Sequence, residues 1–131
     1  MNLLHIYQSF GDETRLRILH LLTQAPLCVC HFQAVLQEPQ VKISKHLHYL
    51  KSRGLVESRQ HQNWRIYKLP DHPGYALDRH LKCLQDCIRE NDLFRADARR
   101  LQSVTAEAGA IAAQCCGPKR KPGARKAGAG C

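Results

Sequence analysis

The sequence contains no long hydrophobic run and no recognisable export signal. No apolar stretch among its 131 residues approaches the roughly 20 residues that a membrane-spanning helix needs. Residues 1–5 carry neither the basic segment nor the cleavage site of a secretory signal peptide. The length suits one domain with a modest core. We therefore expect a single-domain chain that stays in the cytoplasm.

The sequence also lacks the motifs of common enzymes. It contains no nucleotide-binding glycine loop, no Ser-His-Asp order and no paired-carboxylate site. Cys83 to Arg89 matches the C-x5-R pattern of a phosphatase anion loop, which needs backbone N–H groups curled around an oxyanion. This stretch has no glycine and fits a continuous amphipathic helix, whose amides are already hydrogen-bonded. We predict that the chain is not an enzyme.

Acidic residues are scarce in two segments where basic residues are concentrated. Seven basic side chains and one acid, Glu57, lie between residues 42 and 68. Five basic side chains and no acid lie between residues 117 and 131, whereas the other 89 residues carry eight basic and ten acidic. A local positive field on a nearly neutral body is typical of proteins that bind a polyanion. We expect residues 42–68 to bind nucleic acid; the basic tail also fits a disordered solubilising end.

The hydrophobic spacing predicts a mainly helical chain that contains a helix-turn-helix. Helices are expected over residues 2–10, 12–25, about 30–37 and about 42–53. Asp12 is a good N-cap for the second helix, and Gly54 ends the fourth. The turn at residues 38–40 joins two short helices, the second of which carries polar and basic residues outward. This arrangement is a helix-turn-helix.

The hydrophobic period changes after the fourth helix. Residues 55–59 and 64–69 have the composition of strands and flank a hairpin turn at residues 61–63. A β-hairpin directly after a recognition helix is a wing. The predicted fold is therefore a winged helix-turn-helix, mainly α with a small β-hairpin.

A long terminal helix is predicted from about Tyr75 to Val104. Its apolar seam, suited to a partner helix, consists of Leu77, Leu81, Leu84 and Ile88, continued after a slip by Phe94, Ala98 and Leu101. We expect a dimer formed through terminal helices; packing of this helix onto its own domain is the alternative. Residues 1–104 are thus assigned to the winged helix-turn-helix domain, with a dimerisation helix over about 75–104. Residues 105–131 are assigned to a flexible, basic tail that contains cysteines.

The expected DNA contacts lie on the fourth helix and on the wing. We expect Lys42 and Ser44 to bind phosphates, and Lys45 and His46 to approach base edges in the major groove. The full predicted set is Lys42, Ser44, Lys45, His46, His48, Lys51, Arg59 and Arg65. DNA binding itself requires no cofactor in this interpretation.

Two thiols, Cys28 and Cys30, lie one residue apart, about a dozen residues before the recognition helix. Thiolate sulfur suits soft centres, which include As(III) and Sb(III). On a regular helix such a pair points about 200° apart, so both sulfurs meet one ion only where the backbone is extended or turned. If the pair opens the third helix, the helix N-terminus favours the thiolate. Ion binding would then distort the helix start and displace the recognition helix. The pattern predicts a metal- or metalloid-sensing transcription factor.

Several motifs in this order resemble those of the ArsR-type winged-helix metal-sensing repressors. They are Asp12 to Leu19 (D-x-T-R-L-x-I-L), Leu27 to Cys30, Lys42 to Leu47, Gly54 to Val56 and Trp64 to Leu69. The resemblance covers residues 10–69. It implies a homodimer that binds a palindromic operator in double-stranded DNA, represses it and releases it when an inducer binds. A C-V-C at this position implies As(III) or Sb(III) as inducer, and related members sense zinc, cadmium or lead.

The sequence departs from the family pattern around the thiols. Pro26 and His31 stand where the common motif has acids, and Gln33 stands where many arsenite sensors carry a third cysteine. Cys115-Cys116 is the best candidate for the missing ligand, because a vicinal pair in a polar segment has no packing reason to be cysteine. The predicted metal ligands are therefore Cys28, Cys30, Cys115 and Cys116. We expect the His31 ring to face solvent; the alternative is that its nitrogen joins the thiols and favours Zn(II) or Cd(II).

The zinc-sensing pattern on the last helix is only half present. Asp78 and His80 fit it, but the later positions hold Asn91 and Phe94. We interpret Asp78 and His80 as ordinary surface residues.

Other functions for the cysteines stay open. Cys83 and Cys87 lie four residues apart. We interpret them as small residues at a helix interface, and a pair of metal ligands is the alternative. Seven cysteines, an odd number, in a chain without export signals argue against a disulfide framework and favour metal or redox chemistry. The alternatives to an arsenic sensor are a zinc, cadmium or lead sensor, a thiol redox switch, and a DNA-binding module with incidental thiols.

Overall fold

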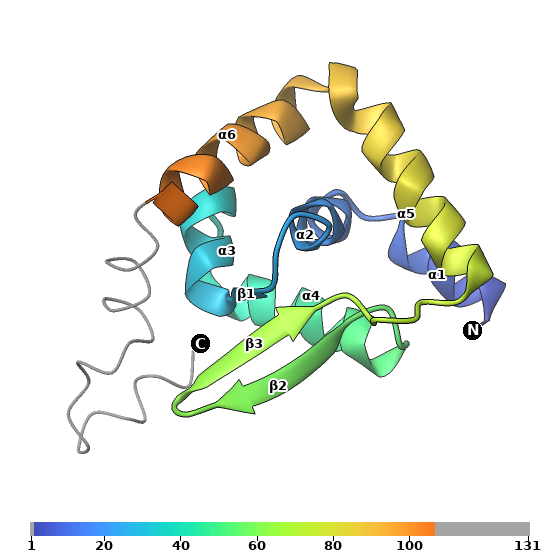
Figure 1. The fold of residues 1–131 in the computed structure, drawn as a ribbon, viewed down its shortest axis with the longest axis horizontal. Coiled ribbons are helices and arrows are strands. Elements are labelled where there is room, and N and C mark those ends of the chain that lie inside the picture. The colour runs from blue at the N-terminus through green and yellow to red at the C-terminus, as the bar shows by residue number, and fades with distance from the viewer. Residues whose placement is uncertain (1, 107–131) are drawn as a thin grey trace.

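The computed structural model describes residues 2–106, which form a mainly helical domain with one small antiparallel sheet (Figure 1). The elements in chain order are α1 (Leu3–Ser9), α2 (Glu13–Leu22), β1 (Leu27–Cys28), α3 (Val29–Leu36), α4 (Gln40–Ser52), β2 (Glu57–His61), β3 (Trp64–Lys68), α5 (Tyr75–Cys87), the 3-10 turn η1 (Ile88–Glu90) and α6 (Asp92–Ala106). The predicted fold class, a mainly α winged helix-turn-helix, is confirmed. No helix in the described part of the chain is long and apolar enough to cross a membrane.

The helix-turn-helix consists of α3 and α4, and local chemistry fixes its boundaries. Gln37 ends α3 in the left-handed conformation, with φ 58°. Pro39, with φ −62°, then precedes α4, where its fixed φ suits a helix start. At α2, the carboxylate of Asp12 accepts a hydrogen bond from the Arg15 N–H at 3.0 Å, which confirms the predicted N-cap.

The wing is the hairpin β2–β3, and a third strand joins it. The strand order is β1-β3-β2, with both pairs antiparallel, and Cys28 is paired with Ile66. Gln62 makes the hairpin turn with φ 57°. The predicted hairpin is confirmed, but β1 was not predicted because a two-residue strand has no periodicity to detect.

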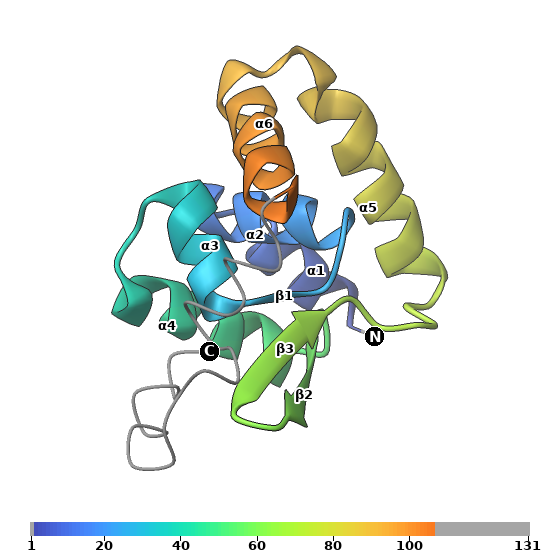
Figure 2. The same cartoon turned by 60° about the vertical axis from the view of Figure 1, so that its left-hand side comes forward.

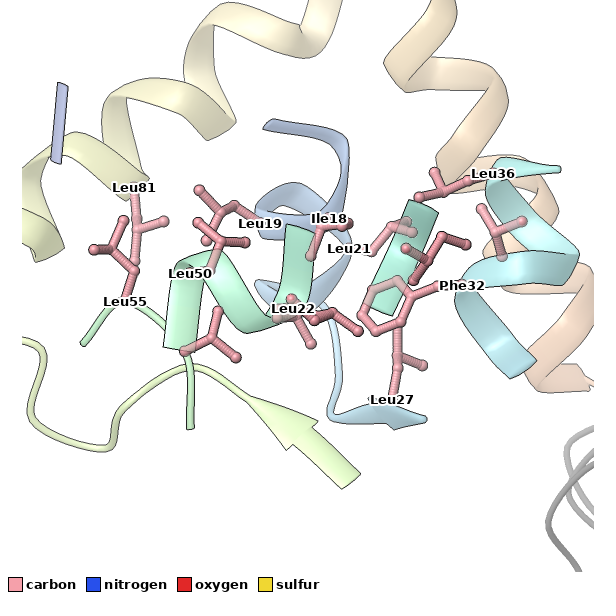
Figure 3. Close-up of a cluster of buried hydrophobic side chains, with 14 of the residues drawn as sticks. Ile18, Leu19, Leu21, Leu22, Leu27, Phe32, Leu36, Leu50, Leu55 and Leu81 are labelled. Carbon is pink, nitrogen blue, oxygen red and sulfur yellow. The ribbon is translucent and has the colours of Figure 1, made fainter. Parts of the chain in front are cut away.

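The core surrounds α2 and joins it to α3 and α4. Ile18, Leu19, Phe32 and Leu50 are fully buried, and Figure 3 shows them with their neighbours between these helices. Removing this much apolar surface from water is the main force that holds the recognition helix in place.

The prediction of one uninterrupted helix from Tyr75 to Val104 is wrong, because the chain bends at Asn91. The backbone of Asn91 is extended (φ −96°, ψ 119°). Its side-chain oxygen accepts hydrogen bonds from the N–H groups of Leu93 and Phe94, at 3.0 and 3.3 Å. Such side-chain bonds are those of an N-cap, so Asn91 ends the first helix segment and starts α6.

The bend lets α6 turn back over α2 and α3, as Figure 2 shows. The Arg17 guanidinium of α2 donates two hydrogen bonds, both 2.8 Å long, to the buried carboxylate of Asp97. Arg100 also donates to the carbonyl of Val35 in α3, at 2.8 Å. For α6 the structure therefore has the alternative arrangement, packing onto its own domain.

The apolar seam predicted to meet a partner helix is also used within the chain. Leu77, Leu81 and Leu84 of α5 belong to the chain's own core. The seam was misassigned because helical spacing reveals an apolar face but not what covers it. Dimerisation itself stays a prediction.

Candidate thiol site and nucleic-acid interface

The two thiols of the C-V-C motif lie side by side at the junction of β1 and α3. Cys28 has an extended backbone (φ −99°, ψ 172°), and Cys30 lies in the first turn of α3. The two Sγ atoms are 2.9 Å apart, and the residues are 0% and 8% exposed. An extended backbone is the condition under which we expect a C-x-C pair to present both sulfurs to one ion.

His31 adds a nitrogen to this cluster. Its Nδ1 accepts a hydrogen bond from the Cys28 N–H at 3.2 Å and lies 3.5 Å from the Cys28 Sγ. The expectation of a solvent-facing ring is therefore wrong for this nitrogen, which points at the first thiol. The signal for this contact was the spacing of three residues at a helix start, where a side chain can reach back to the capping residue.

The environment favours the thiolate form of Cys28. The hydrogen bond with Cys30 lowers its pKa, burial opposes this effect, and the contacts with His31 lower the pKa further, to about 4. Thiolate, not thiol, is the form that binds soft metals.

The thiol pair packs directly against the wing. Trp64 and Ile66 of β3 contact Cys28 and Cys30, and Ile66 is also the strand partner of Cys28. On its other side the pair continues into α3, which packs on α4. The thiols thus contact the wing directly and are linked to the recognition helix through α3.

The other predicted metal ligands are not part of the described structure. Cys115 and Cys116 lie outside the described residues, so their part in a site stays a prediction. Within residues 2–106, no group of three or more His, Cys, Asp or Glu side chains is arranged to hold a metal ion. From this part of the chain, a bound ion would receive two sulfurs side by side.

The recognition helix α4 displays most of its predicted contacts to solvent. The exposed side chains are Lys42, Lys45, His48 and Lys51. Ser44 is half-buried, and the Lys42 ammonium lies 3.2 Å from the Glu38 carboxylate. A surface ion pair of this kind is weak, so Lys42 is available to phosphate.

His46 is half-buried and lines the same groove as Lys45 and His48, so its approach to base edges stays a prediction. Its Nε2 lies 3.9 Å from the Asp12 carboxylate. Burial lowers the pKa of His46, and nearby Asp12 opposes that shift. The contact with Asp12 links α4 to the start of α2, and it was not predicted because Asp12 is distant in sequence.

A stacked cluster beside α4 was not predicted as a unit. The guanidinium groups of Arg15 and Arg53 lie over the Tyr49 ring, 4.1 and 3.6 Å from its centroid. These three residues line a groove of about 460 Å³ together with Lys45 and His48. The guanidinium groups of Arg15 and Arg53 add positive charge next to the recognition helix. The pairing of Arg15 with Tyr49 joins two helices, so spacing along one helix did not reveal it.

The wing presents its two predicted arginines differently. Arg59 is exposed, whereas Arg65 is half-buried and donates a hydrogen bond to the Ser58 hydroxyl at 3.0 Å. That bond holds the Arg65 guanidinium along the hairpin, where Arg65 is paired with Gln60 and Arg59 with Ile66.

The half-present zinc pattern on α5 is engaged elsewhere. The two ring nitrogens of His80 lie 2.7 Å from the Ala76 carbonyl and 2.9 Å from the Tyr7 hydroxyl. The Asp78 carboxylate pairs with Lys82 at 3.1 Å. The polar groups of both residues are engaged within the chain, and their interpretation as ordinary surface residues stays a prediction.

Known regulatory proteins have sequences similar to this chain. Residues 12–58, which include both thiols and the recognition helix, match the bacterial regulatory proteins of the arsR family. The arsenic resistance transcriptional regulator ArsR2 of Pseudomonas putida is 34% identical over 102 residues, covering 76% of this chain and 85% of the relative. The arsenical resistance operon repressor of Escherichia coli is 35% identical over 91 residues, covering 66% of this chain and 78% of the relative. The chain belongs to the ArsR family.

The structure of HlyU from Vibrio cholerae N16961 is also similar to this ArsR-family chain. The TM-score is 0.58 at 25% identity, and the match covers 64% of this chain and 88% of HlyU. This likeness supports the winged helix-turn-helix fold.

Membership of the ArsR family makes this chain a transcriptional repressor with a DNA-binding helix-turn-helix. The prediction that it is not an enzyme is confirmed, because the family and the similar proteins are regulators. The C-x5-R match at residues 83–89 lies in α5 and η1, a helical segment and not an anion loop.

Proposed function

We propose that this ArsR-family repressor binds double-stranded operator DNA as a homodimer and releases it when As(III) or Sb(III) binds the Cys28 and Cys30 thiolates. The observation that carries this proposal is the approach of the two sulfurs to 2.9 Å in a buried site that contacts the wing. The similarity to a regulator named for arsenic resistance and to a repressor named for arsenical resistance supports a metalloid inducer.

The chemistry of arsenite suits this pair. In As(OH)3 each hydroxide is replaced by one cysteine sulfur with release of one water, and arsenic stays trivalent. Soft thiolate ligands are preferred by such centres. The lowered pKa of Cys28 keeps a thiolate ready for the first bond. Cys115 or Cys116 would supply the third sulfur, which completes the predicted ligand set.

Ion binding would be transmitted to the DNA-facing elements by displacement. An atom inserted between sulfurs only 2.9 Å apart must separate them. Cys28 is paired with Ile66 of the wing, and Cys30 lies in the helix that packs on α4. Separation of the sulfurs would therefore alter the relative positions of wing and recognition helix, and such differential binding couples the two sites.

The DNA-binding face would combine α4 with the wing. Lys45 and His48 would face base edges, while Lys42, Lys51 and Arg59 would hold phosphates. The stacked guanidinium groups of Arg15 and Arg53 would extend this positive surface.

A homodimer is supported by exposed apolar side chains on α1. Leu3, Leu4 and Tyr7 are 50%, 60% and 56% exposed. Tyr7 also contacts His80 of α5, so α1 and α5 form one continuous surface. Contiguous exposed apolar side chains mark interaction sites, and family members are dimers.

Fluorescence anisotropy of a labelled duplex from upstream of the gene tests this function. The reduced protein should bind the duplex and release it at stoichiometric arsenite. Cys28→Ala should bind DNA equally well but no longer respond, while Cys83→Ser serves as the matched thiol control and should respond normally. DNA binding that arsenite leaves unchanged in the unaltered protein would overturn the arsenic assignment and leave a winged-helix repressor with another inducer.

The short distance between the sulfurs also favours a second candidate, a thiol redox switch. Hydrogen peroxide would accept two electrons and two protons from Cys28 and Cys30, giving one disulfide and two waters. Release of the duplex by peroxide but not by arsenite would select this function over the first.

A further inference from the structure

A second pair of thiols lies on α5. Cys83 and Cys87 are separated by one helical turn, and their Sγ atoms are 3.8 Å apart. Both residues are exposed. Residues four apart on a helix share one face, so the backbone of α5 holds these sulfurs next to each other without tertiary contacts.

Packing within the chain does not account for this pair. The buried face of α5 consists of Leu77, Leu81 and Leu84, and the two cysteines lie outside it. Cysteine is usually a buried residue, but these two side chains are exposed, so packing in the core does not explain why they are cysteines.

Neighbouring polar side chains do not complete a three-ligand site. Both nitrogens of His80, one turn before Cys83, are engaged by Ala76 and Tyr7. The carboxylate of Asp86 pairs with Arg89 at 3.3 Å. Across residues 2–106 there is no cluster of three or more potential metal ligands, so α5 offers two sulfurs and no more.

We propose that Cys83 and Cys87 form a second, bidentate thiol site for trivalent arsenicals that carry one organic substituent. Such a compound, R–As(OH)2, has two exchangeable positions, which match two sulfurs. Two S–H groups condense with two As–OH groups, forming two As–S bonds and two waters, while arsenic stays trivalent and the organic group keeps its bond. The product staples one turn of α5.

The exposure of the pair fits this chemistry. The organic substituent would project into solvent, which the buried Cys28–Cys30 site does not allow. This site does not depend on the proposed arsenite response at Cys28 and Cys30.

Native mass spectrometry with phenylarsine oxide, which hydrates to a compound of this class, tests the proposal on the full chain. After washing with excess glutathione to remove singly bonded adducts, the unaltered protein should retain more phenylarsenic than either Cys83→Ser or Cys87→Ser. Each single variant should lose one equivalent, because both sulfurs hold the same arsenic. Both positions are exposed, so the variants should keep the far-UV circular dichroism of the unaltered protein.

The matched control moves one thiol without changing the number of thiols. Gln85→Cys combined with Cys87→Ser places the pair two residues apart, about 200° around the helix. It should lose the same equivalent as the single variants. An unchanged adduct count in both single variants, or retention by the control, would overturn the bidentate site. If neither the unaltered protein nor any variant retained phenylarsenic on α5, the pair would be covered in solution. That result would also overturn the proposal. Loss of arsenite-driven DNA release has no bearing on this count, so the two proposals fail separately.

Discussion

Residues 2–106 contain two pairs of cysteines in opposite environments. Cys28 and Cys30 are buried between a strand and a helix start, where the pKa of Cys28 is lowered to about 4. Cys83 and Cys87 are exposed on one face of a continuous helix, where the pKa of Cys87 is raised. The first pair is brought together by tertiary structure and the second by helical spacing alone. Position in the fold therefore lowers the pKa of one cysteine, Cys28, and raises that of another, Cys87.

The comparison also separates signalling from binding. The buried pair contacts Trp64 and Ile66 of the wing, so its geometry is coupled to the DNA-facing elements. The exposed pair lies on α5 and has no contact with β3 or α4 among those described. A ligand at either pair would bind by the same As–S bonds, but only the buried pair has an evident route to the operator.

The largest expected difference is in DNA release. In Cys28→Ala the arsenite concentration for half-release should rise by about 100-fold or more, since one lost As–S bond costs well above the ~1.4 kcal/mol of a tenfold change. Cys83→Ser should leave this midpoint unchanged. Titration of arsenite into the protein–duplex complex measures both. If Cys83→Ser impaired arsenite-driven release of the duplex as much as Cys28→Ala did, the two pairs would not differ in their coupling to DNA binding.

The second prediction concerns the buried ion pair between Arg17 of α2 and Asp97 of α6, which holds α6 against α2. In Asp97→Ala the Arg17 guanidinium is left buried without a partner, which should lower the free energy of unfolding by about 3–5 kcal/mol. The control, Asp86→Ala, removes the exposed pair with Arg89 and should cost about 0–1 kcal/mol. Urea denaturation gives both values. If the free energy of unfolding falls equally in the two variants, the Arg17–Asp97 pair does not hold α6 in place.

The third prediction uses pH to distinguish the pairs. Thiolate absorbance at 240 nm should show one step near pH 4, absent from Cys28→Ala, while Cys87 should titrate above its ordinary value of 9.0. The Cys28 pKa is lower in the folded state than its ordinary value of 9.0, so the thiolate stabilises the fold. That contribution is complete above pH 9.0, decreases as the pH falls and is gone below about pH 4. A Cys28 step near its ordinary value would refute the charged state of the buried pair.

The smallest expected effect is that of His31→Ala. Loss of the ring removes the contacts that help to lower the pKa of Cys28, so the absorbance step should move upward by about one pH unit or less. The Cys28 N–H also loses its acceptor, which should cost about 1 kcal/mol. The same titration and a urea curve measure these changes. A downward shift would contradict the part assigned to His31.

The sequence was sufficient to predict the features that depend on short spacings. Helix periodicity, the cap at Asp12 and strand composition predicted the helix-turn-helix and its wing, and all three are local signals. The C-x-C motif indicated where two sulfurs would meet, because its geometry requires an extended backbone at Cys28.

Features that join distant segments could not be predicted from spacing. Arg17 and Asp97 are 80 residues apart, and nothing in either segment indicates the other. The His46 Nε2 lies 3.9 Å from the carboxylate of Asp12 in another segment, and helical spacing alone does not reveal that contact. The spacing of the apolar residues changes before Phe94, and this change is the local sequence signal of the bend at Asn91. A change in spacing alone does not distinguish a bent helix from a supercoiled one.

Trp64 is the only tryptophan in the chain and packs against the cluster formed by Cys28 and Cys30. Sulfur in contact with an excited indole shortens its emission lifetime, and the contact changes when the sulfur gains a bond. Events at Cys28 and Cys30 should therefore be visible as a change in the decay of a single native chromophore, without any label on protein or DNA. The placement that couples the thiols to the wing thus also makes the wing an optical detector of their state.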